Sequence, residues 1–193
     1  MAEELPQASG RTALLIIDMI NDMNFDKAGD LLAEIDAAVE VIASLRSDAD
    51  AAGVPVIFVN DNFDQWHSEA TRIIKHVEAT PGREVARRLR PREHDYFVIK
   101  PHISGFYATN LSVLLPRLGA SRLVLTGVAA DICVLFAAAD AHMREYALWV
   151  PKDAVASDRP DHRDWALGIM TKSMGADTRT TTELSLQQWL DRG

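Results

Sequence analysis

Residues 12–18 read TALLIID, a continuous apolar run that ends in a carboxylate. Short runs of this kind are typical of strands that are buried on both faces of a parallel sheet. A second apolar run, VPVIFVN, occupies residues 54–60, and apolar residues at helical spacing fill residues 31–52 between the two. This strand–helix–strand order predicts a parallel β-sheet covered by helices.

The same alternation continues along the rest of the chain. Further strands are predicted at residues 95–100 (DYFVIK), 122–127 (RLVLTG), 147–150 and, as a sixth strand at the edge, 177–181. Further helices are predicted at residues 68–76, 82–89, 111–118, 131–146, 161–174 and 184–190. Together they predict an α/β fold, a three-layer α/β/α sandwich around a six-stranded, mainly parallel, Rossmann-like sheet. We expect one domain over residues 1–193, with residues 1–10 as a flexible N-terminal extension.

Composition narrows the class of protein. The chain has 193 residues, 48% of them hydrophobic, which is enough for one substantial core. With 20 basic and 28 acidic side chains the net charge is −8, and the basic run at residues 83–92 contains Glu84, which is typical of a solvated helix face rather than a nucleic-acid surface. The first ten residues lack the apolar segment of a signal peptide. No run of the sequence approaches the roughly 20 apolar residues of a membrane span. With one cysteine, the chain can form no internal disulfide. We therefore expect a cytoplasmic protein with a small-molecule substrate and neither nucleic-acid nor membrane partners.

Three reactive side chains are predicted to meet at one edge of the sheet. Asp18 ends the first strand, Lys100 ends the third, and Cys133 opens the helix after the fourth. Ligands of open parallel sheets bind outside the carboxyl ends of the strands. In the first turn of a helix capped by Asp131, the Cys133 thiolate should be stabilised by the helix dipole, which lowers the pKa of the thiol.

Each of these residues also has a purely structural interpretation. A lone cysteine is commonly a small buried hydrophobe, an aspartate after a strand can cap a turn, and a lone lysine can be solvated. Together, however, they supply a base, a cation and a nucleophile, which are the parts that cysteine-dependent hydrolysis requires.

Several other chemistries lack their sequence motifs. The residues after the first strand read MINDMNF, without the G-x-G-x-x-G of dinucleotide binders. The chain contains neither a Walker-type glycine loop nor the G-x-S-x-G of serine hydrolases. We therefore expect no cofactor.

Three segments resemble those of the isochorismatase-like cysteine hydrolases. They are LLIIDMINDMNF at residues 14–25, VIKPHISGFYATNL at residues 98–111 and GVAADICVLFAAADA at residues 127–141. The resemblance extends from residue 12 to residue 179 and implies a catalytic triad of Asp18, Lys100 and Cys133. It also implies an oxyanion hole formed by the backbone N–H groups of Ala129 and Cys133, a cis peptide bond between Val128 and Ala129, and a homodimer or homotetramer.

The chain departs from the family pattern at two positions. Ala130 stands where the family commonly has threonine, so a hydroxyl hydrogen bond is missing there. Asn62 stands where the nicotinamidase branch has the first histidine of its metal site, and an amide is a poorer ligand than imidazole for zinc-like ions. We interpret His67 as an ordinary loop residue and predict that the protein binds no metal. We also predict that it lies outside the nicotinamidase branch of the family.

The leading functional hypothesis is hydrolysis of a small C–N bond, in an amide, carbamoyl or ureido group, through an acyl-enzyme on Cys133. Candidates for the substrate-binding wall, each as compatible with a core position as with a pocket, are Phe25, Asn62, Trp66, His102, Phe106, Tyr107 and Phe136. Two alternatives stay open. One is an isochorismatase-type vinyl-ether hydrolase that uses Asp18 and leaves Cys133 a bystander. The other is a non-hydrolytic binding module with Cys133 as a redox-sensing thiol.

Overall fold

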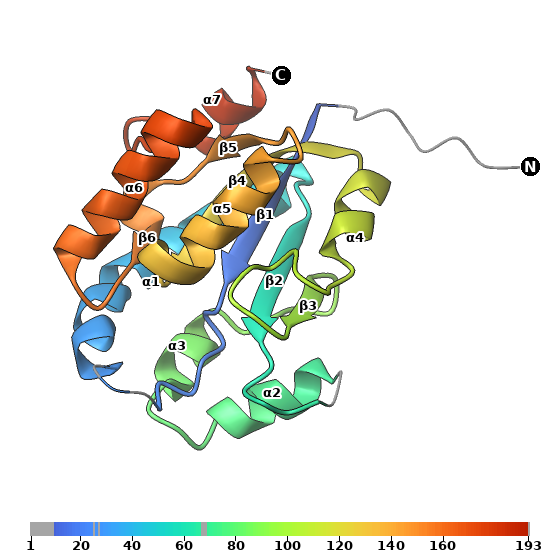
Figure 1. The fold of residues 1–193 in the computed structure, drawn as a ribbon. Coiled ribbons are helices and arrows are strands. Elements are labelled where there is room, and N and C mark those ends of the chain that lie inside the picture. The colour runs from blue at the N-terminus through green and yellow to red at the C-terminus, as the bar shows by residue number, and fades with distance from the viewer. Residues whose placement is uncertain (1–9, 25, 27, 67–68, 193) are drawn as a thin grey trace, which may run out of the picture.

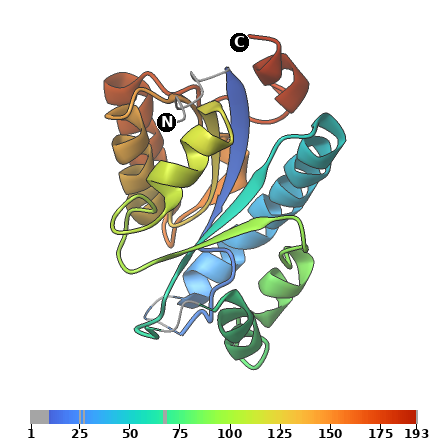
Figure 2. The same cartoon turned by 90° about the vertical axis from the view of Figure 1, so that its right-hand side faces the viewer.

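A computed structural model describes residues 10–24, 26, 28–66 and 69–192, and these form one parallel sheet covered by helices on both faces (Figures 1 and 2). The sheet has six strands in the order β3-β2-β1-β4-β5, with β6 also paired to β4. The strands are β1 (Arg11–Ile17), β2 (Val56–Asp61), β3 (Tyr96–Lys100), β4 (Ala120–Val128), β5 (Ala147–Trp149) and β6 (Val155–Ala156). The α-helices are α1 (Ala28–Ala52), α2 (Ala70–Val77), α3 (Arg83–Arg88), α4 (Leu111–Arg117), α5 (Leu135–His142), α6 (Pro160–Met174) and α7 (Leu186–Leu190). The predicted three-layer α/β/α sandwich is confirmed.

The central strand β1 separates two hydrophobic cores. Its alternate residues point to opposite faces of the sheet, as the pleat of a strand requires. Leu14 and Ile16 pack with the apolar residues of α1, α3 and α7, whereas Leu15 and Ile17 pack with those of α4, α5 and α6. This burial on both sides explains why residues 13–17 are apolar at every position up to the carboxylate of Asp18.

Helix α1 is the longest helix and buries one face against the sheet. Its buried residues include Leu31, Ile35, Val39 and Ile42, at the spacing of one helical stripe. Its other face carries charged residues, and no helix in the described ranges is both long and apolar enough to cross a membrane.

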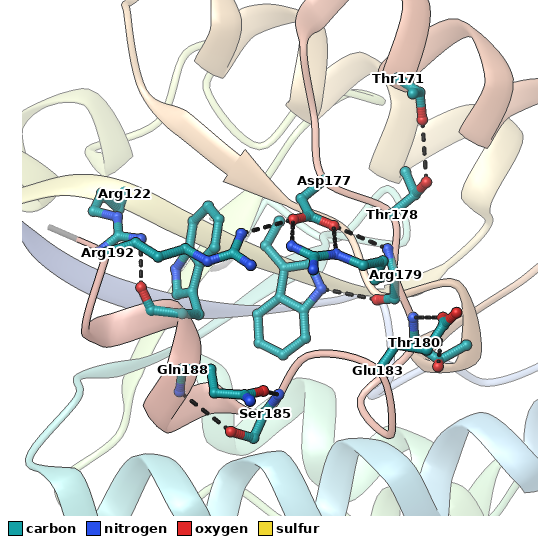
Figure 3. Close-up of polar contacts among 12 residues, drawn as sticks. Arg122, Thr171, Asp177, Thr178, Arg179, Thr180, Glu183, Ser185, Gln188 and Arg192 are labelled. Atoms are coloured by element: carbon teal, nitrogen blue, oxygen red, sulfur yellow. Dashed lines mark hydrogen bonds and ion pairs between the residues drawn. The ribbon is translucent and has the colours of Figure 1, made fainter.

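The prediction of a sixth strand at residues 177–181 is wrong. Asp177 forms a single bridge to Trp149, and its carboxylate then binds the backbone N–H and the guanidinium of Arg179 (Figure 3). These hydrogen bonds hold the chain in a turn and hold the pKa of Asp177 down at about 2. Asp and Thr side chains that bond nearby backbone compete with strand pairing in this way. The sixth strand is instead the two-residue β6, which pairs with Gly127 and Val128 and is too short to show a pattern in the sequence.

Strand β4 approaches β1 so closely at one point that only glycine fits. Gly127 has φ +109°, and a Cβ built on it would lie 2.0 Å from the carbonyl oxygen of Ile17. Asp18 follows Ile17 directly, so this contact brings the end of β1 next to the end of β4. The carboxylate and the segment that carries Cys133 therefore leave the sheet side by side.

Candidate active site

The three predicted reactive side chains meet at the carboxyl edge of the sheet. Asp18 follows β1 with φ 52°, in the left-handed region, and Lys100 is the last residue of β3. Cys133 lies in η1 (Ala130–Val134), a π-helical turn that follows β4 and leads into α5. Single π turns in helices are frequent at functional sites. The predicted position of Cys133 in the first turn of this helix is confirmed.

Lys100 lies between the other two residues. Its Nζ is 2.9 Å from Asp18 Oδ2 and donates a hydrogen bond to Cys133 Sγ at 3.5 Å. The lysine side chain is only 1% exposed, so it is fixed in this position. Asp18 lies close enough to the thiol to act on its pKa. The site therefore holds a carboxylate, an ammonium and a thiol together, with the ammonium in contact with both of the others.

The electrostatics of the site differ from the prediction. The pKa of the Cys133 thiol is raised to about 12, first by burial and then by the charge of Asp18, which outweighs the lowering by Lys100. The predicted lowering of this pKa by the helix N-terminus is therefore wrong, because burial of the thiol and the neighbouring Asp18 carboxylate were not taken into account. Burial also raises the pKa of Asp18 against the opposing charge of Lys100. Burial alone would lower the pKa of Lys100, but its contacts with Asp18, Cys133 and Asp61 outweigh that effect and raise it.

The raised thiol pKa predicts slow alkylation of Cys133 by iodoacetamide near neutral pH. Only the thiolate reacts, so the rate should keep rising with pH beyond about 9, where that of an ordinary cysteine levels off. Because Asp18 contributes to the raised pKa, Asp18→Asn should shift the whole rate profile to lower pH. The pH dependence of the rate, followed by mass spectrometry of this single cysteine, measures both effects. If the alkylation rate had the same pH dependence in the wild type and in Asp18→Asn, the Asp18 carboxylate would not act on the thiol.

Two residues at the end of β2 support Asp18 and were not identified from the sequence. The backbone N–H of Asp61 donates to Asp18 Oδ1 at 2.8 Å, and the Asp61 carboxylate lies 3.5 Å from Lys100 Nζ. Asn60, fully buried, donates to the carbonyl of Ile20 and accepts from its N–H, which anchors the loop after Asp18. The rule that located Asp18 and Lys100 also applied to these residues, since they end a neighbouring parallel strand.

The segment before Cys133 has the features that the family resemblance implies. The Val128–Ala129 peptide bond is cis. Ala129 and Cys133, whose N–H groups are the predicted oxyanion donors, both line one cavity beside the thiol. Asp131 does not cap the helix as expected. Ala129 holds that position, while the Asp131 carboxylate accepts a hydrogen bond from Ser157 Oγ at 2.6 Å.

Two cavities meet at the reactive side chains and share Asp18, Asn21 and Cys133. The first has a volume of about 260 Å³ and the second about 420 Å³. The first is lined by Asp18, Asn21, Asp26, Leu31, Val128, Ala129, Asp131, Ile132, Cys133 and Asp158. The second is lined by Asp18, Asn21, Asp22, Asn24, Asp61, Phe63, Asp64, Lys100, Ile103 and Cys133. Cys133 is therefore reachable from the surface rather than sealed in the core.

The predicted substrate-binding residues lie elsewhere in this structure. Phe106 is buried in the core against Tyr146, and Asn62 is buried with its side chain accepting from the Asp64 N–H. Four others are exposed, namely Trp66, His102, Tyr107 and Phe136. None of these six lines either cavity within the described part of the chain. Phe25 and His67 lie outside the described residues.

The chain is similar to proteins of known family. A family model described as "Isochorismatase domain" matches residues 12–183. The isochorismatase family protein YaaI of Bacillus subtilis is 36% identical over 89% of this chain and 95% of its own length. The ureidoacrylate amidohydrolase RutB of Serratia proteamaculans is 31% identical over 82% of this chain and 75% of its own length. The crystal structure of N-carbamoylsarcosine amidase from Thermoplasma acidophilum has a TM-score of 0.69 and 30% identity, covering 91% of this chain and 99% of that one.

Proposed function

This chain belongs to the isochorismatase family, and we propose that it is a cysteine-dependent hydrolase of small amide, carbamoyl or ureido compounds, with Asp18, Lys100 and Cys133 as its catalytic residues. Hydrolysis of a C–N bond is the activity in the names of its amidohydrolase and amidase relatives. The observation that carries the catalytic assignment is the position of Lys100 Nζ, in contact with both the Asp18 carboxylate and the Cys133 sulfur.

The geometry supports a two-step mechanism. Asp18 accepts the thiol proton as Cys133 attacks the carbonyl carbon, and Lys100 stabilises the sulfur while it is anionic. The N–H groups of Ala129 and Cys133 donate to the oxygen of the tetrahedral intermediate. Asp18 then gives the proton to the leaving amine, which departs and leaves a thioester on Cys133. Asp18 finally takes a proton from water as the water attacks the thioester. It returns this proton to the departing Cys133 sulfur as the acid is released, which restores the carboxylate and the free thiol.

The raised pKa values suit this mechanism. A buried carboxylate with a raised pKa is a stronger base than an exposed one, and it lies near the thiol whose proton it must remove. With the thiol pKa near 12, the resting nucleophile is neutral and loses its proton only as the substrate is attacked. Asp18 is therefore as necessary as the cysteine. A preformed thiolate, by contrast, would need no base to remove its proton.

A screen of small primary amides, N-carbamoyl compounds and ureido compounds against the wild-type protein tests the proposal. We expect release of ammonia or amine from at least one class, with a burst of the first product if the thioester is hydrolysed slowly. Nicotinamide is included as an expected non-substrate, since Asn62 replaces the metal-binding histidine of the nicotinamidase branch. An acyl adduct on Cys133 trapped by acid quench would identify the intermediate. If no compound is cleaved and no adduct forms, the assignment to C–N hydrolysis is wrong.

A further inference from the structure

The walls around the candidate nucleophile are strongly acidic. Among the residues that line the two cavities, the charged side chains are one lysine, Lys100, and seven aspartates, namely Asp18, Asp22, Asp26, Asp61, Asp64, Asp131 and Asp158. No arginine lines either cavity within the described ranges. Clefts lined by one sign of charge concentrate ligands of the opposite sign.

The one lysine does not offset this charge toward a ligand. Lys100 is 1% exposed and is already paired with Asp18 at 2.9 Å and with Asp61 at 3.5 Å. Among the residues that the structure describes, a substrate carboxylate would therefore meet no available cation on these walls and would face several carboxylates. Like charges brought together in a poorly solvated site repel strongly.

The smaller cavity combines this charge with an apolar wall. Leu31, Val128 and Ile132 line it beside Cys133, and Asp131 and Asp158 lie on the same lining. The two carboxylate side chains are 23% and 24% exposed, so a ligand can reach them. Apolar side chains of this kind suit the methylene groups of a short chain, and the two aspartates suit a positive charge at its end.

We propose that the substrates of this site carry a cationic group, an ammonium or guanidinium, at the end of a short aliphatic chain attached to the scissile carbonyl. The methylene groups pack on Leu31, Val128 and Ile132, and the cation binds between Asp131 and Asp158. His162 Nδ1 already contacts both carboxylates, at 3.3 Å from Asp131 and 3.8 Å from Asp158, so the cation would bind beside this ring and share the two carboxylates with it. This inference rests on the proposed function, because it assumes that Cys133 attacks a carbonyl held in this cavity.

Three amides with four carbon atoms each test the charge preference. They are 4-aminobutyramide, which is cationic, butyramide, which is neutral, and succinamate, which is anionic. Ammonia release should give kcat/KM for the cationic amide on the order of tenfold or more above that for the neutral one, and the anionic amide should be the poorest substrate. Raising the ionic strength should narrow these differences, since salt screens partly exposed charges. Equal rates, or a preference for succinamate, would overturn the inference.

Variants locate the preference within the cavity. The double variant Asp131→Asn, Asp158→Asn should reduce the preference for 4-aminobutyramide to within about threefold of butyramide. The matched control is Asp164→Asn on α6, an aspartate paired with Lys152 at 3.3 Å that lines neither cavity, and it should keep the full preference. If the double variant kept that preference too, Asp131 and Asp158 would not be the binding residues.

Binding separates this inference from the proposed function. The three compounds are titrated into Cys133→Ala protein and followed by NMR, which requires no turnover. Tighter binding of 4-aminobutyramide without ammonia release by the wild type would support the charge preference and count against the hydrolase. Hydrolysis of all three compounds at rates that do not depend on their charge would support the hydrolase function and reject the charge preference. Failure of 4-aminobutyramide to bind more tightly than butyramide would also reject it.

Discussion

Replacing Cys133 with alanine is expected to lower kcat/KM for the best amide substrate by about 10⁴-fold or more, because the covalent intermediate can no longer form. The remaining groups still bind substrate and polarise its carbonyl, so a small residual rate over the uncatalysed reaction should persist. Initial rates of ammonia release, measured with wild type and variant at matched concentration, give the ratio. Urea unfolding of both proteins checks that the half-buried site has kept its fold.

Asp18→Asn is the companion variant that separates the rival functions. In the thiol mechanism both substitutions should reduce amide hydrolysis to a small residual rate, since the neutral thiol needs the carboxylate to remove its proton. A vinyl-ether hydrolase that relies on Asp18 alone would keep its activity on isochorismate in Cys133→Ala and lose it in Asp18→Asn. A redox sensor would show rapid, reversible oxidation of Cys133 by mild peroxide and no turnover in any variant. Amide hydrolysis in Cys133→Ala at a rate close to that of the wild type would rule out the nucleophile assignment.

The sequence was sufficient for the parts of the fold that depend on hydrophobic pattern. The runs that became β1 to β4 are apolar because both faces of the sheet are covered, and the carboxyl-edge rule then brought Asp18, Lys100 and Cys133 together. The prediction of a strand at residues 177–181 failed because the hydrogen bonds from Arg179 to Asp177 are a local alternative to strand pairing, which composition does not reveal.

The chemistry of the site depends on quantities that a sequence does not contain. The direction of the pKa shift of Cys133 is set by how much water is excluded and by the approach of Asp18, a residue more than one hundred positions away. The prediction of the residues that line the cavities was wrong for a similar reason. Aromatic residues were expected there, whereas the charged part of the walls is formed by aspartates, among them Asp26 and Asp158 outside the helices and strands, which have no periodic signature. Chain topology predicts where a site lies more readily than what lines it.

The largest expected effect on stability comes from Lys100→Met. Methionine fills a similar volume, but it leaves the Asp18 carboxylate buried without its cation at 2.9 Å. Removal of one partner of a buried ion pair typically costs about 3 to 5 kcal/mol in free energy of unfolding, because the remaining charge is uncompensated. Urea denaturation of wild type and variant near neutral pH measures this difference. The matched control is Lys152→Met, whose partner Asp164 is half-exposed, and it should cost no more than about 1 kcal/mol.

The double variant Asp18→Asn, Lys100→Met distinguishes a charge effect from a packing effect. If the uncompensated carboxylate is the cause, its replacement by a neutral amide should restore most of the lost stability, although activity stays absent. The pH dependence gives a second test with a definite sign. In Lys100→Met the folded-state pKa of Asp18 rises further above its unfolded value, so the penalty is full above that raised pKa and shrinks as the pH falls and the carboxyl gains its proton. A penalty that is unchanged from pH 7 to about pH 5 and survives in the double variant would mean that lost packing, not the unpaired charge of Asp18, sets the stability of this site.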